Sequence, residues 1–218
     1  MKRVTFTLKN VTCIETEDYT GEDEFYVVGL YTVLPANSNV PREVGPPTIS
    51  GIWDLNDGEH VNPNYNILKQ SVVFDESAEV LRFDLKCLDR DISADLEDVS
   101  DASLQDAADK VKKAADHVAD AEKAITEGNE NSQVGAAVAE VISSLNPVTA
   151  ALRSAEWITS TLWKALRGSL ALDKDDLLGE DFYEFIPNVS TAPDEFDKTF
   201  DCMYDGCKYK VAYTVKIA

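Results

Sequence analysis

Two acidic stretches that lie far apart in the chain have the residue types of a divalent-cation site. The first is Asp89-Arg90-Asp91, at the end of an apolar strand-like segment, and the second is the run DKDD at 173–176, which opens another such segment. Carboxylates crowded at strand ends repel one another unless a cation or a proton neutralises them. Oxygen ligands in loops suit Ca²⁺, which accepts about six to eight of them. These residues favour a calcium-responsive binding module.

The charge of the chain limits its partners. The sequence of 218 residues has 40 Asp and Glu against 20 Lys and Arg, which gives a net charge of −20. Such a surface repels phosphate backbones, so we expect no nucleic-acid partner. It also repels anionic membranes, unless bound cations reverse the local sign of the charge.

Catalytic motifs are missing from the sequence. It contains no Gly-rich phosphate loop, no G-x-S-x-G elbow and no H-E-x-x-H helix. The two histidines, His60 and His117, have no metal-ligand spacing, which also argues against zinc. Paired carboxylates can hydrolyse glycosides, but metal binding explains the acidic cluster better. We therefore expect that the protein is not an enzyme and has no catalytic residues.

Location and redox state are only loosely constrained. The N-terminal residues 1–8 alternate like a strand and lack the apolar run of a signal peptide, and no segment reaches the about 18 to 20 apolar residues of a membrane span. We expect a soluble chain, cytoplasmic by default, with leaderless export as the alternative. Cys13 and Cys87 have apolar, strand-like surroundings typical of buried thiols. Cys202 and Cys207 bracket a hairpin-like turn and could form a disulfide, which a cytosolic chain would keep reduced.

The chain has strand texture at both ends and helical texture in the middle. Apolar residues recur at spacings of three and four from Leu104 to Ile125 and again from Val134 to Leu166. Asp101 or Ser103 can cap the first of these helices, and Pro147 should kink or restart the second. The segment 35–65 is rich in Pro, Asn and Gly and is predicted as mostly loops. This order favours a helical hairpin inserted into a β domain.

Three segments resemble the C2 family of calcium- and phospholipid-binding β-sandwiches. Joining residues 81–91 to 176–179 gives a strand that ends in D-x-D, then an Asp before two apolar residues and a Gly, as in the third calcium-binding loop of that family. Residues 18–27, DYTGEDEFYV, look like its D-x-x-G-x-S-D-P-Y-V stretch in the first loop. The turn at 62–66, NPNYN, is similar to its N-P-x-W-N, without the Trp. The chain departs from the pattern at Glu24 and Phe25, which stand for Asp and Pro, and by the split of the third loop.

The resemblance implies a fold and a set of ligands. The expected fold is mostly β with an α-helical insertion: a C2-like antiparallel β-sandwich from residues 1–91 and 173–218, with a helical hairpin at 92–172 in the third calcium-binding loop. Carried over position by position, the calcium ligands are Asp18, Glu24, Asp89, Asp91 and Asp176. Asp23 and Asp175 are the adjacent alternatives for a register one residue away. The opposing interpretation is a C2-like shell whose acids are simply solvated and bind no metal.

Tryptophan and leucine gather late in the second helical segment. Residues 132–168 carry two acidic against three basic side chains, so this stretch has a charge of +1 within a strongly acidic chain. Such a helix could lie in a membrane interface or against a second copy of the chain, through Trp157, Leu162, Trp163 and Leu166. The alternative is that it packs on the first helix and on the sandwich.

The sequence thus predicts Ca²⁺-dependent attachment to membrane phospholipid or to a protein partner, through a rim of carboxylates and the inserted hairpin. The rival prediction is a structural protein whose hairpin mediates homo-oligomerisation, with the β domain as a scaffold. Both flanks of the hairpin carry complete strand patterns. We therefore also expect that a short Gly/Ser link can replace residues 92–172 without unfolding the sandwich.

Overall fold

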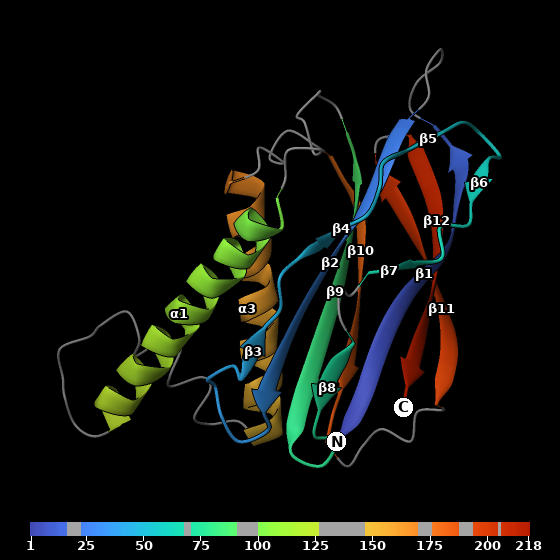
Figure 1. The fold of residues 1–218 in the computed structure, drawn as a ribbon. Coiled ribbons are helices and arrows are strands. Elements are labelled where there is room, and N and C mark those ends of the chain that lie inside the picture. The colour runs from blue at the N-terminus through green and yellow to red at the C-terminus, as the bar shows by residue number, and fades with distance from the viewer. Residues whose placement is uncertain are drawn as a thin grey trace.

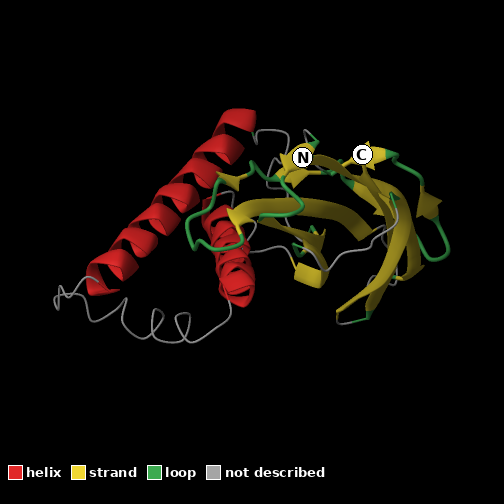
Figure 2. Ribbon diagram, turned by 90° about the horizontal axis from the view of Figure 1, so that it is seen from below, coloured by secondary structure: helices red, strands yellow, loops and turns green. Residues whose placement is uncertain are grey.

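The computed structural model describes residues 1–16, 23–67, 71–90, 100–126, 147–169, 176–187, 194–204 and 206–218. The chain folds into two antiparallel sheets that face each other, with two helices against the outer side of one sheet (Figures 1 and 2). The long strands are β1 (Lys2–Glu15), β2 (Asp23–Pro35), β9 (Glu79–Asp89), β10 (Asp176–Phe185), β11 (Glu195–Tyr204) and β12 (Cys207–Ile217). The helices are α1 (Asp101–Thr126) and α3 (Pro147–Ser169).

Each sheet has three long strands and one interrupted edge. Sheet A has the order β11–β12–β1, and sheet B has the order β10–β9–β2. Short strands complete both edges: β6 (His60–Val61), β7 (Tyr65–Asn66) and β8 (Val72–Phe74) pair with β1, while β3 (Glu43–Val44), β4 (Thr48–Ile49) and β5 (Trp53–Leu55) pair with β2. Most of these pieces come from the segment predicted as loops. Proline, which cannot donate to a ladder, confines such a segment to short edge strands.

The inner core joins the two sheets. Alternate residues of β1, among them Val4, Phe6 and Leu8, are fully buried because side chains two apart in a strand share a face. The ring of Phe6 stacks on Phe83 of β9, with ring centroids 3.8 Å apart. Aromatic contacts of this kind link sheet A to sheet B along the length of the sandwich.

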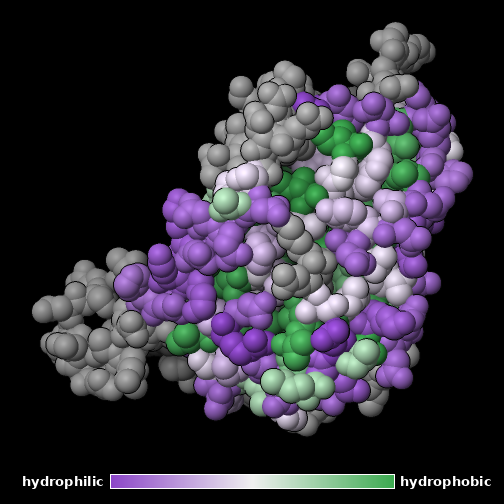
Figure 3. All heavy atoms as spheres, in the orientation of Figure 1, coloured by the Kyte–Doolittle hydropathy of each residue, from purple (hydrophilic) through white to green (hydrophobic). Residues whose placement is uncertain are grey.

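A second core lies between sheet B and the helices. Strand β2 is apolar on both faces: Val27 belongs to the inner core, whereas Tyr26, Val28 and Leu30 pack in the second one. Helix α3 contacts β2 and β9, and α1 packs on α3 and β3. The side of α1 seen in Figure 3 is hydrophilic, so α1 is amphipathic and closes this core. Sheet B is therefore covered on both faces.

The helices begin where local chemistry permits. Helix α3 begins at Pro147, where proline is tolerated because the first helical position needs no backbone donor. The Oγ atom of Ser100 accepts a hydrogen bond from the backbone N–H of Ser103 at 3.2 Å. Ser100 is therefore the N-cap of α1, in place of the expected Asp101 or Ser103.

The predicted fold class is confirmed: the protein is a mostly β sandwich with a helical insertion. The expected ease of removing residues 92–172 does not fit the second core. Fully buried side chains of β2 and β9, such as Val28, Leu30 and Leu88, pack against the helices. Without the helices these apolar groups would face water, so we now expect the opposite outcome.

Candidate functional site

One end of sheet B brings the two acidic stretches together. Strand β9 ends at Asp89, which lies directly opposite Phe25 at the start of β2 and directly opposite Asp176 at the start of β10. Residues 89 and 176 are thus neighbours in space, although both helices lie between them in the sequence. The helices are inserted between β9 and β10, and these two strands still pair at the ends where the insertion leaves and re-enters the sheet. We call this pair, Asp89 and Asp176, the rim.

Alternation along β9 places Asp89 on the face of the strand that points toward the inner core. Cys87, two residues earlier, packs in the inner core, whereas Leu88 packs in the second core. Phe25, opposite Asp89, stacks on Tyr209 of sheet A with ring centroids 4.4 Å apart. Asp89 is only 8% exposed. Like charges directly opposite each other in an antiparallel pair destabilise the pairing unless they are neutralised.

Glu24 differs from its expected place. It precedes Phe25, so alternation puts it on the opposite face of β2 from that inner-core residue. There Glu24 Oε2 lies 3.9 Å from Arg90 Nε, and Glu24 pairs across the sheet with Asp54 of β5. The structure therefore does not bring Glu24 to the face of Asp89, contrary to the expected ligand set. The physical reason is the period of two along a strand.

The remaining predicted ligands are only partly described. Asp18, Asp91 and the alternative Asp175 lie outside the described residues, and for Asp176 the structure describes the backbone and its pairing. Within the described part of the chain, no group of three or more His, Cys, Asp or Glu side chains is placed to hold a metal ion.

A hollow of about 670 Å³ lies beside β5, the strand that pairs with the start of β2. Trp53, Asp54, Glu59 and His60 are among the residues that line it. The ring of Trp53 stacks on Phe25 with centroids 6.5 Å apart, so the hollow adjoins the strand end that meets Asp89. It offers an aromatic surface flanked by carboxylates.

Three of the four residues expected to form a binding surface are buried. Leu162 and Leu166 of α3 are fully buried and Trp163 is 7% exposed, all within the second core. Trp157 is 43% exposed. This corrects the expected surface of lipid or self-contact for those three residues, because they face sheet B and α1. No helix of the described chain is long and apolar enough to cross a membrane.

The disulfide that the hairpin spacing left open, between Cys202 and Cys207, is not formed in the structure. In the β11–β12 hairpin Cys202 lies opposite Tyr209, and Cys207 lies opposite Tyr204, so the two cysteines sit on a diagonal. All four cysteines are buried and none is disulfide-bonded.

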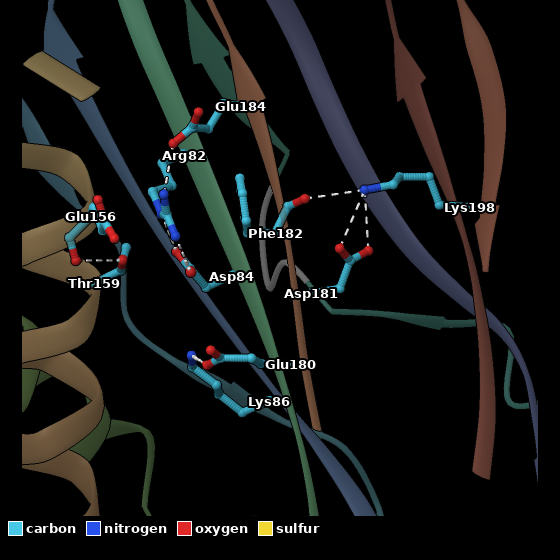
Figure 4. Close-up of polar contacts among 10 residues, drawn as sticks. All are labelled: Arg82, Asp84, Lys86, Glu156, Thr159, Glu180, Asp181, Phe182, Glu184 and Lys198. Carbon is cyan, nitrogen blue, oxygen red and sulfur yellow. Dashed lines mark hydrogen bonds and ion pairs between the residues drawn. The ribbon is translucent and has the colours of Figure 1, made fainter. Parts of the chain in front are cut away.

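Two polar networks escape prediction from the sequence (Figure 4). On the outer face of sheet B, the Arg82 guanidinium donates to both carboxylate oxygens of Asp84 at 2.9 Å and to Glu184 at 2.7 Å. Lys86 forms an ion pair with Glu180 in the next rung. These residues are spaced two apart on paired strands, which is the signal that register alone could have revealed. Their charges largely satisfy one another, so we assign them to the stability of the sheet.

The second network closes the side of the sandwich where β10 meets β11, which we call the seam. The ammonium group of Lys198 lies 3.1 Å from Asp181 Oδ2 and donates to the carbonyl oxygen of Phe182 at 3.1 Å. The hydroxyl of Tyr213 donates to the same carboxylate at 2.9 Å. Burial and the nearby Asp181 charge raise the pKa of Tyr213, so this hydroxyl stays protonated. The seam joins the two sheets through β10, β11 and β12.

Comparison with protein-family models, with curated proteins and with solved structures gives no match for this chain.

Proposed function

We propose that the protein is a calcium-dependent binding module, built on a C2-like sandwich, that attaches to anionic oxygens of membrane phospholipid or of a protein partner. The observation that supports this most is the rim. Asp89 is nearly buried, and the register of β9 and β10 places it directly opposite Asp176, so two acidic positions meet at one strand end. A calcium ion at this place would remove the repulsion and leave coordination positions for a partner.

The proposed ligand set follows from strand parity. Asp89 and Asp176 hold the ion, and Asp23 joins them in place of Glu24. Asp23 is two residues before Phe25 and pairs with Leu55, a residue of the inner core, so its position has inner-face parity. Asp18 and Asp91 complete the proposed set. Because Ca²⁺ accepts about six to eight oxygens, water and the partner supply the rest.

Attachment then depends on a local change of charge. The chain carries −20 overall and repels an anionic surface, so a bound cation is what allows contact at the rim. The hollow lined by Trp53 and His60 offers an aromatic contact next to the ion. No catalytic step belongs to this proposal.

Self-assembly through the hairpin has less support. Leu162, Trp163 and Leu166 are occupied within the chain, and Trp157 is the member of that predicted set which remains exposed. A single exposed tryptophan is a normal feature of a protein surface.

Metal binding is tested by thermal unfolding in CaCl₂, MgCl₂ and EGTA. A hundredfold excess of Ca²⁺ over its dissociation constant should stabilise the protein by about 2.7 kcal/mol, which raises Tm by roughly 5 to 10 °C. Mg²⁺ should have a smaller effect because it demands tighter octahedral geometry. Asp89→Asn should abolish the shift, while the matched Asp54→Asn, beside Glu24, should retain it. Equal Tm values of the wild-type protein in millimolar CaCl₂ and in EGTA would rule the proposal out.

The partner is tested separately. Sedimentation with phosphatidylserine vesicles should deplete the wild-type protein from solution in CaCl₂ but leave it there in EGTA, and Asp89→Asn should stay in solution in both. Calcium binding without vesicle binding would assign the anionic oxygens to a protein. Oligomers of equal size in CaCl₂ and EGTA, together with no metal-dependent Tm shift, would favour the assembly role instead.

A further inference from the structure

Two buried cysteines from different sheets meet at the seam. Cys87 of β9 lies directly opposite Gly179 of β10. A Cβ atom on Gly179 would stand 2.8 Å from the Cα atom and 3.3 Å from the Sγ atom of Cys202, so β11 sits directly on this glycine. Glycine is needed here because any side chain would push β11 away. The Cys87 thiol is hydrogen-bonded with Cys202.

The geometry of the pair Cys87 and Cys202 suits a disulfide better than the geometry of the pair Cys202 and Cys207. Residues directly opposite in an antiparallel pair have Cβ atoms about 4.5 to 5.5 Å apart, and the Cβ atom of Cys202 lies 3.1 Å from the Cβ position of Gly179. The two thiols are in hydrogen-bonding contact across this position, so their side chains point toward each other, as a disulfide with its Cβ separation of about 3.5 to 4.5 Å requires. Cys202 and Cys207 are diagonal neighbours, about 7 to 8 Å apart, which is beyond that reach.

We propose that Cys87 and Cys202 are a dithiol that closes into a disulfide between the two sheets when the chain folds in the presence of a disulfide oxidant such as oxidised glutathione. The thiolate of one cysteine attacks glutathione disulfide, forms a mixed disulfide and releases one reduced glutathione. The thiolate of the second cysteine then displaces the other glutathione. The two electrons and the two thiol protons end on the two glutathione molecules, so the exchange is balanced.

Burial of the two thiols determines when the disulfide can form. Both thiols are fully buried in the folded protein, and burial raises the pKa of the Cys87 thiol well above its ordinary value. Because the thiolate is the reacting form, the folded dithiol reacts slowly with an oxidant, and the disulfide forms mainly before the seam closes. The compartment in which the chain folds therefore decides its state. A reducing compartment yields the dithiol, and an oxidising one yields a link whose loop contains α1, α3 and β10.

The test is refolding of the whole chain from denaturant, either in a mixture of reduced and oxidised glutathione or in dithiothreitol. After alkylation and digestion, mass spectrometry should find the Cys87–Cys202 linked peptide in the glutathione sample, with Cys13 and Cys207 alkylated. The oxidised protein should melt about 5 °C or more above the reduced one, because the link constrains a long loop. A different linked pair, or four alkylated cysteines in the glutathione sample, would overturn the proposal.

Matched variants and a native-state control sharpen the result. Cys13→Ala and Cys207→Ala should keep the linked peptide and the rise in Tm, whereas Cys202→Ala should lose both. Should Cys202→Ala not fold, peptide mapping of the wild-type protein still decides the pairing. Folded, reduced protein exposed to oxidised glutathione should form the link at least about tenfold more slowly than refolding protein does. Equal rates would overturn the role of the seam in controlling closure.

Discussion

The outer faces of the two sheets differ, although both sheets contribute to the same inner core. Sheet A presents half-buried polar side chains such as Thr7, whose hydroxyl donates to Asn66 Oδ1 at 3.0 Å, and Thr5, which hydrogen-bonds with Ser71 at 2.9 Å. Sheet B presents Tyr26, Val28 and Leu30, all fully buried beneath the helices. This difference indicates that the helices are held on the sandwich by their packing against the outer apolar face of β2, and not by the inner core.

Removal of the helices should have the largest effect on this comparison. Replacing residues 92–172 by a Gly/Ser link would expose the apolar outer face of sheet B, so we expect the shortened chain to aggregate or to lose its near-ultraviolet circular dichroism. Size-exclusion chromatography with light scattering measures the first outcome. A monomeric shortened chain with native near-ultraviolet circular dichroism would show that sheet B does not need its cover.

A variant of the shortened chain tests whether its instability comes from the exposed apolar face of β2 or from another effect of removing the helices. Val28→Thr and Leu30→Thr make the outer face of β2 resemble the outer face of sheet A, and threonine retains β propensity. In the shortened chain these substitutions should increase the fraction recovered as monomer. No recovery would mean that the helices stabilise the sandwich by something other than covering β2.

Two tryptophans of the same helix should respond very differently. Trp163 is 7% exposed and its ring lies 5.8 Å from the guanidinium carbon of Arg167, whereas Trp157 is 43% exposed. We expect Trp163→Ala to lower the free energy of unfolding by about 3 to 5 kcal/mol and Trp157→Ala by less than about 1 kcal/mol. Urea unfolding of both variants measures the difference. Equal losses of unfolding free energy would contradict the view that only one side of α3 packs against the rest of the protein.

Reciprocal substitutions on the two outer faces should give the smallest effects. Val28→Thr places a hydroxyl in the second core and should cost about 1 to 3 kcal/mol. Thr7→Val removes one exposed hydrogen bond but adds a good strand former, so its effect should stay within about 1 kcal/mol. Urea unfolding again compares the two variants. A larger loss for Thr7→Val would mean that the outer face of sheet A also packs against something.

The sequence could predict much of the fold because its signals are local. Alternation in β1, the spacing of three and four in α1 and the proline at 147 each depend on neighbouring residues. One pattern in the sequence indicated a feature of the fold that the sequence-based prediction did not include. The apolar run from Phe25 to Leu34 has no polar alternation, which is typical of a strand buried on both faces, and so it indicated the cover that α3 provides.

The candidate site was less accessible to sequence reasoning. The C2 resemblance placed Asp89 and Asp176 in one set of five ligands, whereas that these two residues lie directly opposite each other is seen only in the strand register. Glu24 was assigned by motif position, yet the parity of β2 places it on the other face, beside Arg90. The position of Cys202 beside Cys87 required knowledge of how sheet A lies on sheet B, and no spacing within the chain encodes that.

By itself the sequence determined the strands, the helices, the acidity and the exclusion of common catalytic motifs, because these depend on composition and on periods of two or 3.6 residues. Tertiary structure alone decided which face of each strand is used and which distant residues touch. It buried Leu162, Trp163 and Leu166, brought Asp89 to Asp176, and laid Cys202 on Gly179. The physical reason is that register and sheet packing are set by the summed burial of many side chains, which no single motif contains.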